Sequence, residues 1–456
     1  MKKRRFLSLF LLLSLLLSLF LTPKAGAFEE FDLDARAGLL VEASTGEVLF
    51  EKNAHQENYP ASITKLMTAL LVFEAIDSGR LSLTDPLTAS ESALSGLPRD
   101  GSTADIKVGE TLTVEQLLYC MLVVSANEAC NILAEAVCGS IDAFVARMNA
   151  RAEELGCENT HYVNTSGLHD PSHYSSAWDI YLITCEAMKH DLLMTMCNSK
   201  SYEVPATNMT DKPRTLHSTN YLISNWRAIG YLYRDAQGIK TGSTPEAGYC
   251  LVSSAVRGSR TLISVVLGAE RREDADGVTR TYSFIETSRL FDYGFDNFVE
   301  RRIISSDEAI CEVPVALSGE TNYVVVHPAG DVTRMLPIGL APEELERTVT
   351  LYHDTVYAPI AAGDELGTLT LSYQGTVYGE VPLLALADVS ASWFLVAQHR
   401  VMEFFSRTVV RLVALVLLVL IAALVVYRLV FARRRRYGRS RSGFSRSGYR
   451  GRRRRK

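Results

Sequence analysis

Sixteen consecutive uncharged residues, Leu412 to Tyr427, lie near the end of the chain, with Arg411 before them and Arg428 after them. A helix that crosses a bilayer needs about 20 predominantly apolar residues, and arginine side chains at its ends can reach the polar interface. Short apolar flanks extend the run, so the sequence predicts a transmembrane helix over residues 412–432. We therefore expect a membrane partner for the chain.

The segment after this helix, residues 433–456, contains 13 lysine and arginine side chains and no acidic one. Positive charge next to a spanning helix is retained on the cytoplasmic side. We interpret the segment as the basic cytoplasmic tail of a single-pass protein. The alternative, a nucleic-acid-binding arm, is disfavoured because the adjacent helix already explains the charge.

The first 27 residues have the pattern of a secretory signal peptide. Positive residues at 2–5 precede an apolar run at 6–21, and the small residues Ala25 to Ala27 form a cleavage site before Phe28. An uncleaved signal anchor is the alternative, because the apolar run is almost long enough to span a bilayer. With a cleaved signal peptide, the mature chain begins outside the cytoplasm.

The 456 residues are 47% hydrophobic and 22% charged, which excludes fibrous and disordered classes and indicates two or three domains. The net charge of -5 hides a segregation along the chain. The two ends carry 18 positive charges and no acidic residue, so residues 28–432 carry a net charge of -23. We expect no nucleic-acid partner for this body, because phosphate binding requires clustered lysine and arginine.

Hydrophobic periodicity predicts an α/β domain over residues 28–297. It should begin with a hairpin at 37–51, followed by a buried helix from Ser62 to Gly79 that is apolar nearly all round. The later elements are a helix opened by a capping box at Thr113, a helix over 127–137, and antiparallel strands over 238–241, 249–256 and 261–267.

Beyond residue 297 the pattern changes to short β-rich runs separated by glycine turns, which predicts a small all-β domain over residues 298–388. Residues 389–411 then mix aromatic, aliphatic and polar side chains. This composition predicts an amphipathic helix that lies at the membrane surface.

The first candidate for chemistry is Ser62 with Lys65 at the start of the buried helix. Residues three apart share a helix face, so the Lys65 amine can reach the Ser62 hydroxyl. Burial lowers a lysine pKa, which allows the amine to accept a proton and activate the serine as a nucleophile. By itself the spacing is common, and a surface lysine is the alternative.

The second candidate is Ser125 with Asn127, between two predicted helices. Here Ser125 would relay a proton and Asn127 would donate a hydrogen bond to a substrate carbonyl. The alternative is a helix N-cap, a frequent place for serine and asparagine.

The third candidate is Lys240, Thr241 and Gly242 on a strand at a sheet edge. A lysine and a hydroxyl can hold a substrate carboxylate there, and a glycine allows another backbone to approach closely. An exposed strand lysine before a turn is the alternative.

The order of these motifs, and their contexts at a helix start, an interhelical loop and a sheet edge, match the SxxK, SxN and KTG set of penicillin-recognising serine acyl-transferases. Because of these three motifs and their order, residues 35–390 closely resemble the D-alanyl-D-alanine carboxypeptidases, which are low-molecular-mass penicillin-binding proteins. Further stretches also carry the resemblance, namely Asn164–Leu168, His173–Ala177 and Ala247–Tyr249.

The resemblance implies an antiparallel sheet flanked by helices, an all-β accessory domain and a bacterial membrane anchor. It also implies that Ser62 attacks the carbonyl between two D-alanines, with Lys65 as general base and Ser125 passing a proton to the leaving D-alanine. Lys240 and Thr241 would hold the substrate carboxylate, and the backbone N–H groups of Ser62 and Ser243 would form an oxyanion hole. A β-lactam would acylate Ser62 by the same route.

The sequence departs from the family pattern at Ala126, where glycine is frequent, a change that should not move the chemistry. Some relatives also bind the substrate carboxylate through an arginine beyond the KTG strand. Arg271 and Arg272 are both candidates for that role.

No cofactor or metal is expected. His161, His169, His173 and Asp170 lie close in sequence, but their spacings do not match a helical HExxH zinc site. The eight cysteines contain no CxxC pair, and the sequence leaves their pairing open.

The leading hypothesis is therefore a membrane-anchored exported enzyme that removes the terminal D-alanine from peptidoglycan stem peptides. A β-lactamase or an endopeptidase on the same fold is the first alternative, although no additional glutamate signature for rapid deacylation precedes Lys240. A non-catalytic cell-wall scaffold is the second, and the intact set of motif residues argues against it.

Overall fold

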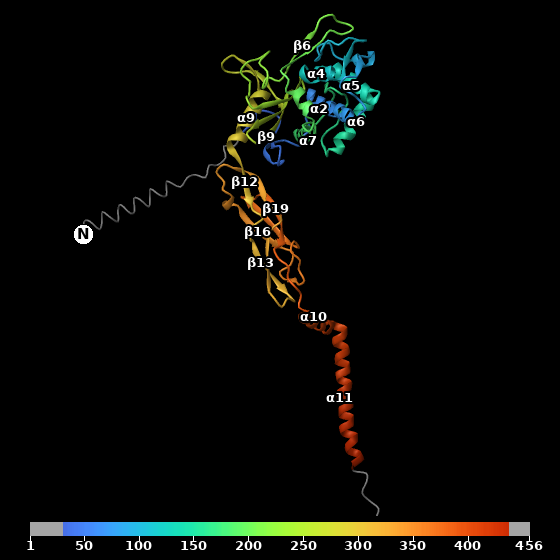
Figure 1. Cartoon of the computed structure of the whole chain (residues 1–456), viewed down its shortest axis with the longest axis vertical. Coiled ribbons are helices and arrows are strands. Elements are labelled where there is room, and N and C mark those ends of the chain that lie inside the picture. Colours follow the sequence, from blue (N-terminus) through green and yellow to red (C-terminus); the bar gives the residue numbers. More distant parts are fainter. Residues whose placement is uncertain (1–30, 437–456) are drawn as a thin grey trace, which may run out of the picture. The chain divides into compact units, whose positions relative to one another are not determined.

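The computed structural model describes residues 31–436, with side chains as far as residue 429 (Figure 1). The predicted signal peptide and residues 437–456 of the predicted tail lie outside the described residues. The described chain forms two compact units. Unit 1 runs to Ile303 and includes Thr333–Glu344, and unit 2 contains Ile304–Val332 and the chain from Leu345 onward.

The centre of unit 1 is a five-stranded sheet in the order β2-β1-β9-β8-β7, with antiparallel neighbours. The strands confirm the predicted hairpin and the predicted three-strand meander. Strand β7 has one neighbour, so the lysine motif lies on the edge strand, as predicted. The five strands are β1 (Ala37–Glu42), β2 (Val48–Lys52), β7 (Ala236–Thr244), β8 (Gly248–Arg257) and β9 (Arg260–Ala269).

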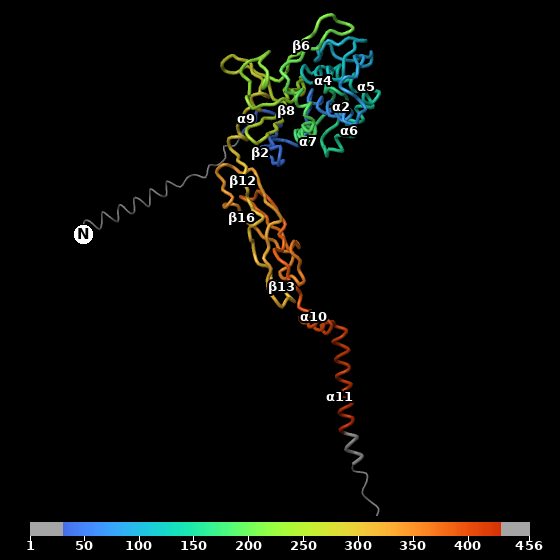
Figure 2. The backbone as a smooth tube through the Cα atoms, in the orientation of Figure 1, coloured from blue at the N-terminus to red at the C-terminus, as the bar shows by residue number. Residues whose placement is uncertain are grey.

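Both faces of this sheet are buried, because alternate residues of its strands enter two different hydrophobic clusters. On β9, Ile263 and Val265 pack with the helical group that includes α2, while Leu262 and Val266 pack with α9 (Tyr282–Asn297). Figures 1 and 2 show strands β8 and β9 between α9 and this helical group. The helices on the α2 side are α2 (Lys65–Asp77), α4 (Val114–Val123), α5 (Asn127–Cys138), α6 (Ile141–Glu154), α7 (Ala177–Ala187) and α8 (Asp191–Cys197).

The central helix differs from its prediction at both ends. Ser62 lies in a 3-10 turn, η1 (Ala61–Thr64), and the α-helix α2 begins only at Lys65. Helix α2 ends at Asp77, and Gly79 follows with a left-handed φ of 71° that ends the helix without side-chain strain. Because side chains three apart eclipse in a 3-10 turn, the change preserves the proximity of Ser62 and Lys65.

Two other helix starts matched their predictions. Helix α4 begins after Thr113 with a complete capping box, in which the Thr113 hydroxyl and the Gln116 side chain each accept a backbone N–H. Helix α5 begins at Asn127, as predicted. The smaller elements of unit 1 are α3 (Glu91–Leu94), β3 (Pro86–Thr88), β4 (Thr111–Thr113), β5 (Ser201–Val204), β6 (Arg214–His217), β10 (Arg271–Glu273), β11 (Thr279–Thr281), β15 (Val332–Pro337) and η2 (Pro342–Glu344).

Unit 2 contains a six-stranded sheet in the order β16-β18-β19-β14-β13-β17. Its pairs are antiparallel except β13 with β17. Strand β12 (Phe298–Ile304), which begins in unit 1, pairs with β15. The sheet strands are β13 (Cys311–Ala316), β14 (Tyr323–Pro328), β16 (Glu346–Leu351), β17 (Val356–Tyr357), β18 (Glu365–Tyr373) and β19 (Thr376–Ala385).

Two helices end the described chain. Helix α10 (Trp393–Ser406) carries exposed aromatic and aliphatic side chains, and α11 (Thr408–Arg436) follows after Arg407. Residues Thr408–Leu429 have a mean hydropathy of 3.2, and within the described residues α11 is the single continuous helix long and apolar enough to cross a membrane.

Candidate active site

The side chains of Ser62 and Lys65 meet where η1 passes into α2. Lys65 is fully buried, and its Nζ lies 2.8 Å from Ser62 Oγ, 2.9 Å from Asn127 Oδ1 and 2.7 Å from the Ser166 carbonyl oxygen. Two of these three neighbours can only accept hydrogen bonds. A neutral amine has two hydrogens and one lone pair, so it can donate to both acceptors and keep its lone pair for the Ser62 hydroxyl.

Burial lowers the pKa of Lys65 to about 8, and the neighbouring Cys130 and Glu128 oppose that shift. The surface-lysine alternative is therefore wrong for Lys65. A buried amine that loses its proton near neutral pH is suited to accept the proton of an adjacent hydroxyl.

Ser125 and Lys240 form a second hydroxyl–amine pair. Lys240 Nζ donates a hydrogen bond to Ser125 Oγ at 3.0 Å and another to the backbone carbonyl oxygen of Thr241 at 2.9 Å. Lys240 is 1% exposed, so it is not an exposed strand lysine. Burial, and then repulsion by Lys65, lower its pKa to about 7.

The backbone around Ser125 also excludes the helix-cap alternative. The N-cap of α5 is Ala126, with no side-chain capping bond. Ser125 has a left-handed φ of 65°, a conformation that costs a non-glycine residue of order 1 kcal/mol or more and is concentrated at functional sites. The Asn127 side chain contributes its oxygen to Lys65.

Gly242 brings the edge strand against the nucleophile. A Cβ at this position would lie 2.8 Å from the Pro60 carbonyl oxygen and 3.0 Å from the Ser62 nitrogen, so a larger residue would push β7 away from η1. The close approach predicted for this glycine is present, with η1 as its partner. Beside it, the Thr241 hydroxyl is 2.6 Å from the hydroxyl of Thr219.

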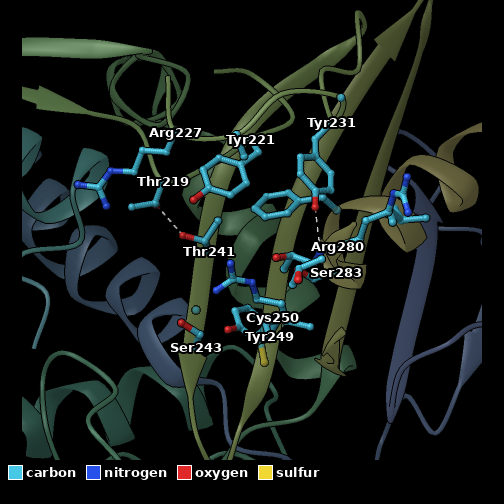
Figure 3. A pocket seen from close by; sticks show the side chains of 18 of the residues that line it. Thr219, Tyr221, Arg227, Tyr231, Thr241, Ser243, Tyr249, Cys250, Arg280 and Ser283 are labelled. Carbon is cyan, nitrogen blue, oxygen red and sulfur yellow. Dashed lines mark hydrogen bonds between the residues drawn. The ribbon is translucent and has the colours of Figure 1, made fainter. Parts of the chain in front are cut away.

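A cavity of about 690 Å³ opens over these groups (Figure 3). Ser62, Ser125, Thr241, Gly242 and Ser243 line it.

The two candidate arginines have different surroundings. Arg271 lines the cavity, whereas Arg272 pairs with Asp34 and lies 3.8 Å above the ring of Tyr282.

The histidines flagged by the sequence form internal contacts. His173 is buried, its Nδ1 accepts the backbone N–H of Val163, and its Nε2 lies 2.8 Å from the Thr64 hydroxyl. Burial lowers the pKa of His173 to about 4, so the ring is neutral and donates to Thr64 through Nε2. His161 Nδ1 contacts the Ser172 carbonyl oxygen at 2.6 Å.

Sequence reasoning missed three contributors to this site. The Ser166 carbonyl holds Lys65, Thr219 supports Thr241, and the buried Glu128 accepts the Thr103 hydroxyl and the Ala104 N–H, both at 2.7 Å. The first lies in the Asn164–Leu168 stretch that carried the family resemblance. Glu128 follows the Ser125–Asn127 motif within another stretch that carried the resemblance, whereas nothing in the local sequence distinguishes Thr219.

The helix–sheet–helix fold, with a serine and a buried lysine beside an edge strand, defines the class of serine-type penicillin-binding enzymes. Residues 24–271 match the family described as D-alanyl-D-alanine carboxypeptidase, and residues 298–391 match the C-terminal domain of penicillin-binding protein 5. The chain belongs to the D-alanyl-D-alanine carboxypeptidase family.

Individual relatives agree with this assignment. The D-alanyl-D-alanine carboxypeptidase DacF of Bacillus subtilis is 31% identical over 374 residues, which cover 82% of this chain and 90% of the relative. DacC of Escherichia coli is 32% identical, with 79% and 86% covered. The crystal structure of penicillin-binding protein 5 from Haemophilus influenzae superposes with a TM-score of 0.61 at 29% identity, over 79% of this chain and 98% of that one.

Proposed function

We propose that this chain removes the terminal D-alanine from peptidoglycan stem peptides, with Ser62 as nucleophile and Lys65 as general base. The observation that carries the proposal is the set of three neighbours of Lys65 Nζ. Two acceptors take the hydrogens of the neutral amine, so its lone pair is directed at Ser62 Oγ.

The reaction proceeds by acyl transfer. Lys65 takes the proton of Ser62, Oγ bonds to the carbonyl carbon between the two D-alanines, and the backbone N–H groups of Ser62 and Ser243 hold the oxyanion. Each such donor is worth about 3 kcal/mol in related chemistry. The C–N bond breaks as the leaving amine receives a proton through Ser125, and water then hydrolyses the ester on Ser62.

The substrate carboxylate sets the protonation of the two lysines. Lys240, Thr241 and Arg271 hold this carboxylate, and a negative charge beside Lys240 favours its charged form. A charged Lys240 in turn disfavours a second charge on Lys65. Substrate binding thus keeps the proton on Lys240 and leaves Lys65 neutral, while Asn127 binds the substrate amide and retains its oxygen contact with Lys65.

The chain is further proposed to be anchored in a bacterial cell membrane. The exposed apolar face of α10 lies at the interface, and α11 spans the bilayer with the basic residues from 433 onward in the cytoplasm. Residues 28–297 would then be the extracytoplasmic catalytic domain, with 298–388 as its accessory domain.

The test is release of free D-alanine by the full chain in detergent micelles from an acylated peptide ending in D-Ala-D-Ala. Release should depend on Ser62 and should stop after treatment with a β-lactam. A peptide ending in L-Ala-L-Ala serves as the matched control. Absence of D-alanine release by folded wild-type protein would overturn the proposal.

A further inference from the structure

The buried histidine His173 has no part in the proposed reaction. It is 2% exposed and lies shortly before the start of α7. Both of its ring nitrogens are engaged, because Nδ1 accepts the N–H of Val163 at 3.1 Å and Nε2 donates to the Thr64 hydroxyl at 2.8 Å. The side chain therefore joins η1, which carries Ser62, to the segment 163–168.

The segment 163–168 fixes much of its own shape. The Asn164 side chain accepts the backbone N–H groups of three residues in this segment and donates to the Leu168 carbonyl. Gly167 has a left-handed φ of 82°, and a Cβ on it would clash with the Ala61 carbonyl. The segment thus packs backbone against backbone on η1, and only its placement there is left for other contacts to set.

The proposed base depends on this placement. Lys65 Nζ donates to the Ser166 carbonyl at 2.7 Å, and the preceding carbonyl, on Thr165, accepts the Thr68 hydroxyl at 2.6 Å. With the Ser166 carbonyl as an acceptor, the lone pair of the neutral amine is left for Ser62 Oγ. If the segment moved, the Lys65 amine would be free to turn its lone pair away from the nucleophile.

The two hydrogen bonds of His173 require a neutral ring with its proton on Nε2. Burial lowers the pKa of His173 to about 4, and Asp170 opposes that shift. The other titratable groups nearby, His161, Lys65 and His169, lower the pKa further. The ring is therefore neutral at neutral pH. A charged ring would present N–H donors at both nitrogens and lose the bond that Nδ1 accepts.

We propose that His173 is a positioning residue of the acyl-transfer site. Through the Thr64 hydroxyl it holds η1 against the segment 163–168. The nucleophile and the Ser166 carbonyl then stay within hydrogen-bonding distance of the Lys65 amine. His173 is not among the described residues that line the cavity, and it exchanges no proton, so its contribution is geometric. This inference rests on the proposed function, because it concerns the rate of acylation.

The experiment compares two replacements of the ring, in the full chain in detergent micelles. Leucine makes no hydrogen bond, whereas the terminal amide of glutamine offers one donor and one acceptor, as the neutral ring does. Single-turnover reaction with benzylpenicillin separates the acylation rate constant from the dissociation constant. We expect His173→Leu to lower the rate constant by about 10- to 100-fold, the cost of a small misplacement of reacting groups, and to leave the dissociation constant near that of wild type. His173→Gln should restore most of the rate.

The partner hydroxyl supplies an independent test. Thr64→Val removes the hydroxyl at nearly constant size and should lower the rate constant as much as His173→Leu does. Thr64→Ser keeps the hydroxyl and should preserve most of the rate. The double variant of Thr64→Val and His173→Leu should lose no more than either single variant, because two residues that act through one contact are not additive.

His161→Gln is the matched control, because the exposed His161 ring contacts the Ser172 carbonyl, and it should acylate at the wild-type rate. An unchanged rate in His173→Leu, equal losses in the leucine and glutamine variants, or losses that add in the double variant would overturn the positioning role. So would an effect confined to the dissociation constant. Thermal unfolding identifies any variant that does not fold, and if His173→Leu is one, the Thr64 variants decide. Absence of acylation in folded wild type would instead count against the proposed function.

Discussion

The two units bury different kinds of side chain. Unit 1 buries charged residues, among them Lys65, Lys240, Glu110 and Glu128, while the buried side chains of unit 2, over its described residues, are apolar. Burying a charge costs stability unless hydrogen bonds and partners compensate it. Unit 2 therefore avoids this cost. Unit 1 bears it at Lys65 and Lys240, the two lysines that the proposed chemistry uses, while the charge of Glu110 is compensated by its ion pair with Arg214.

The largest effect in this comparison should come from Ser62→Ala, which removes the proposed nucleophile from unit 1. We expect kcat to fall by about 10⁴-fold or more, as for nucleophiles of other serine enzymes. The melting temperature should remain near that of wild type, since Ser62 is only partly buried. D-alanine release and calorimetry of the same preparation measure both quantities, and residual activity within tenfold of wild type would contradict the assignment.

In unit 2, Leu371→Ala should act on stability alone. Leu371 is fully buried in β18, and truncation of a buried leucine typically costs about 2–5 kcal/mol. Calorimetry should show a destabilised transition, while kcat/KM on a soluble peptide stays unchanged. Val377→Ala, at a 59% exposed position of β19, is the control with little expected effect. A loss of activity in Leu371→Ala would contradict the expectation that unit 2 contributes to stability and not to catalysis.

The buried lysines should give unit 1 a distinctive pH dependence. The folded pKa of Lys240, about 7, lies below its unfolded value of about 10.4. Between these values the unfolded chain binds the additional proton, so stability relative to Lys240→Met should rise with pH by up to about 1.4 kcal/mol per unit. Below pH 7 this contribution is constant and unfavourable.

Denaturant unfolding at a series of pH values between about 6 and about 10, a range that begins below the folded pKa and stays below the unfolded pKa of about 10.4, measures this slope. Lys212→Met, which alters an exposed lysine, should keep the slope of wild type. Identical slopes for wild type and Lys240→Met would show that Lys240 remains charged in the folded protein.

The smallest effect concerns the scaffold around the site. Thr113→Ala removes the hydroxyl that caps α4 and should destabilise unit 1 by about 1 kcal/mol without changing kcat. Thr113→Ser retains the hydroxyl and should preserve most of the stability. A change in unfolding free energy that is the same for both variants would show that the capping bond is not the cause.

Sequence patterns predicted the parts of the fold that depend on local chemistry. The capping box predicted the start of α4, apolar runs separated by a turn predicted β7 to β9, and an apolar surround predicted the burial of Lys65. The exact start of α2 was missed because a 3-10 turn and an α-helix share the same spacing of three.

Contacts made through the backbone could not be predicted in the same way. The Ser166 carbonyl that holds Lys65 has no side-chain signature, and its approach depends on packing between segments about 100 residues apart in sequence. The burial of Lys240 was also missed, because an edge strand suggests exposure while Ser125 and the helices beside β7 cover it.

The central claim is that Ser62 carries the acyl group. Intact-mass and peptide mass spectrometry of the full chain after exposure to a penicillin tests it directly. One covalent adduct should form, should map to the peptide that contains Ser62, and should be absent from Ser62→Ala. An adduct on a different residue, or one that persists in Ser62→Ala, would contradict the account.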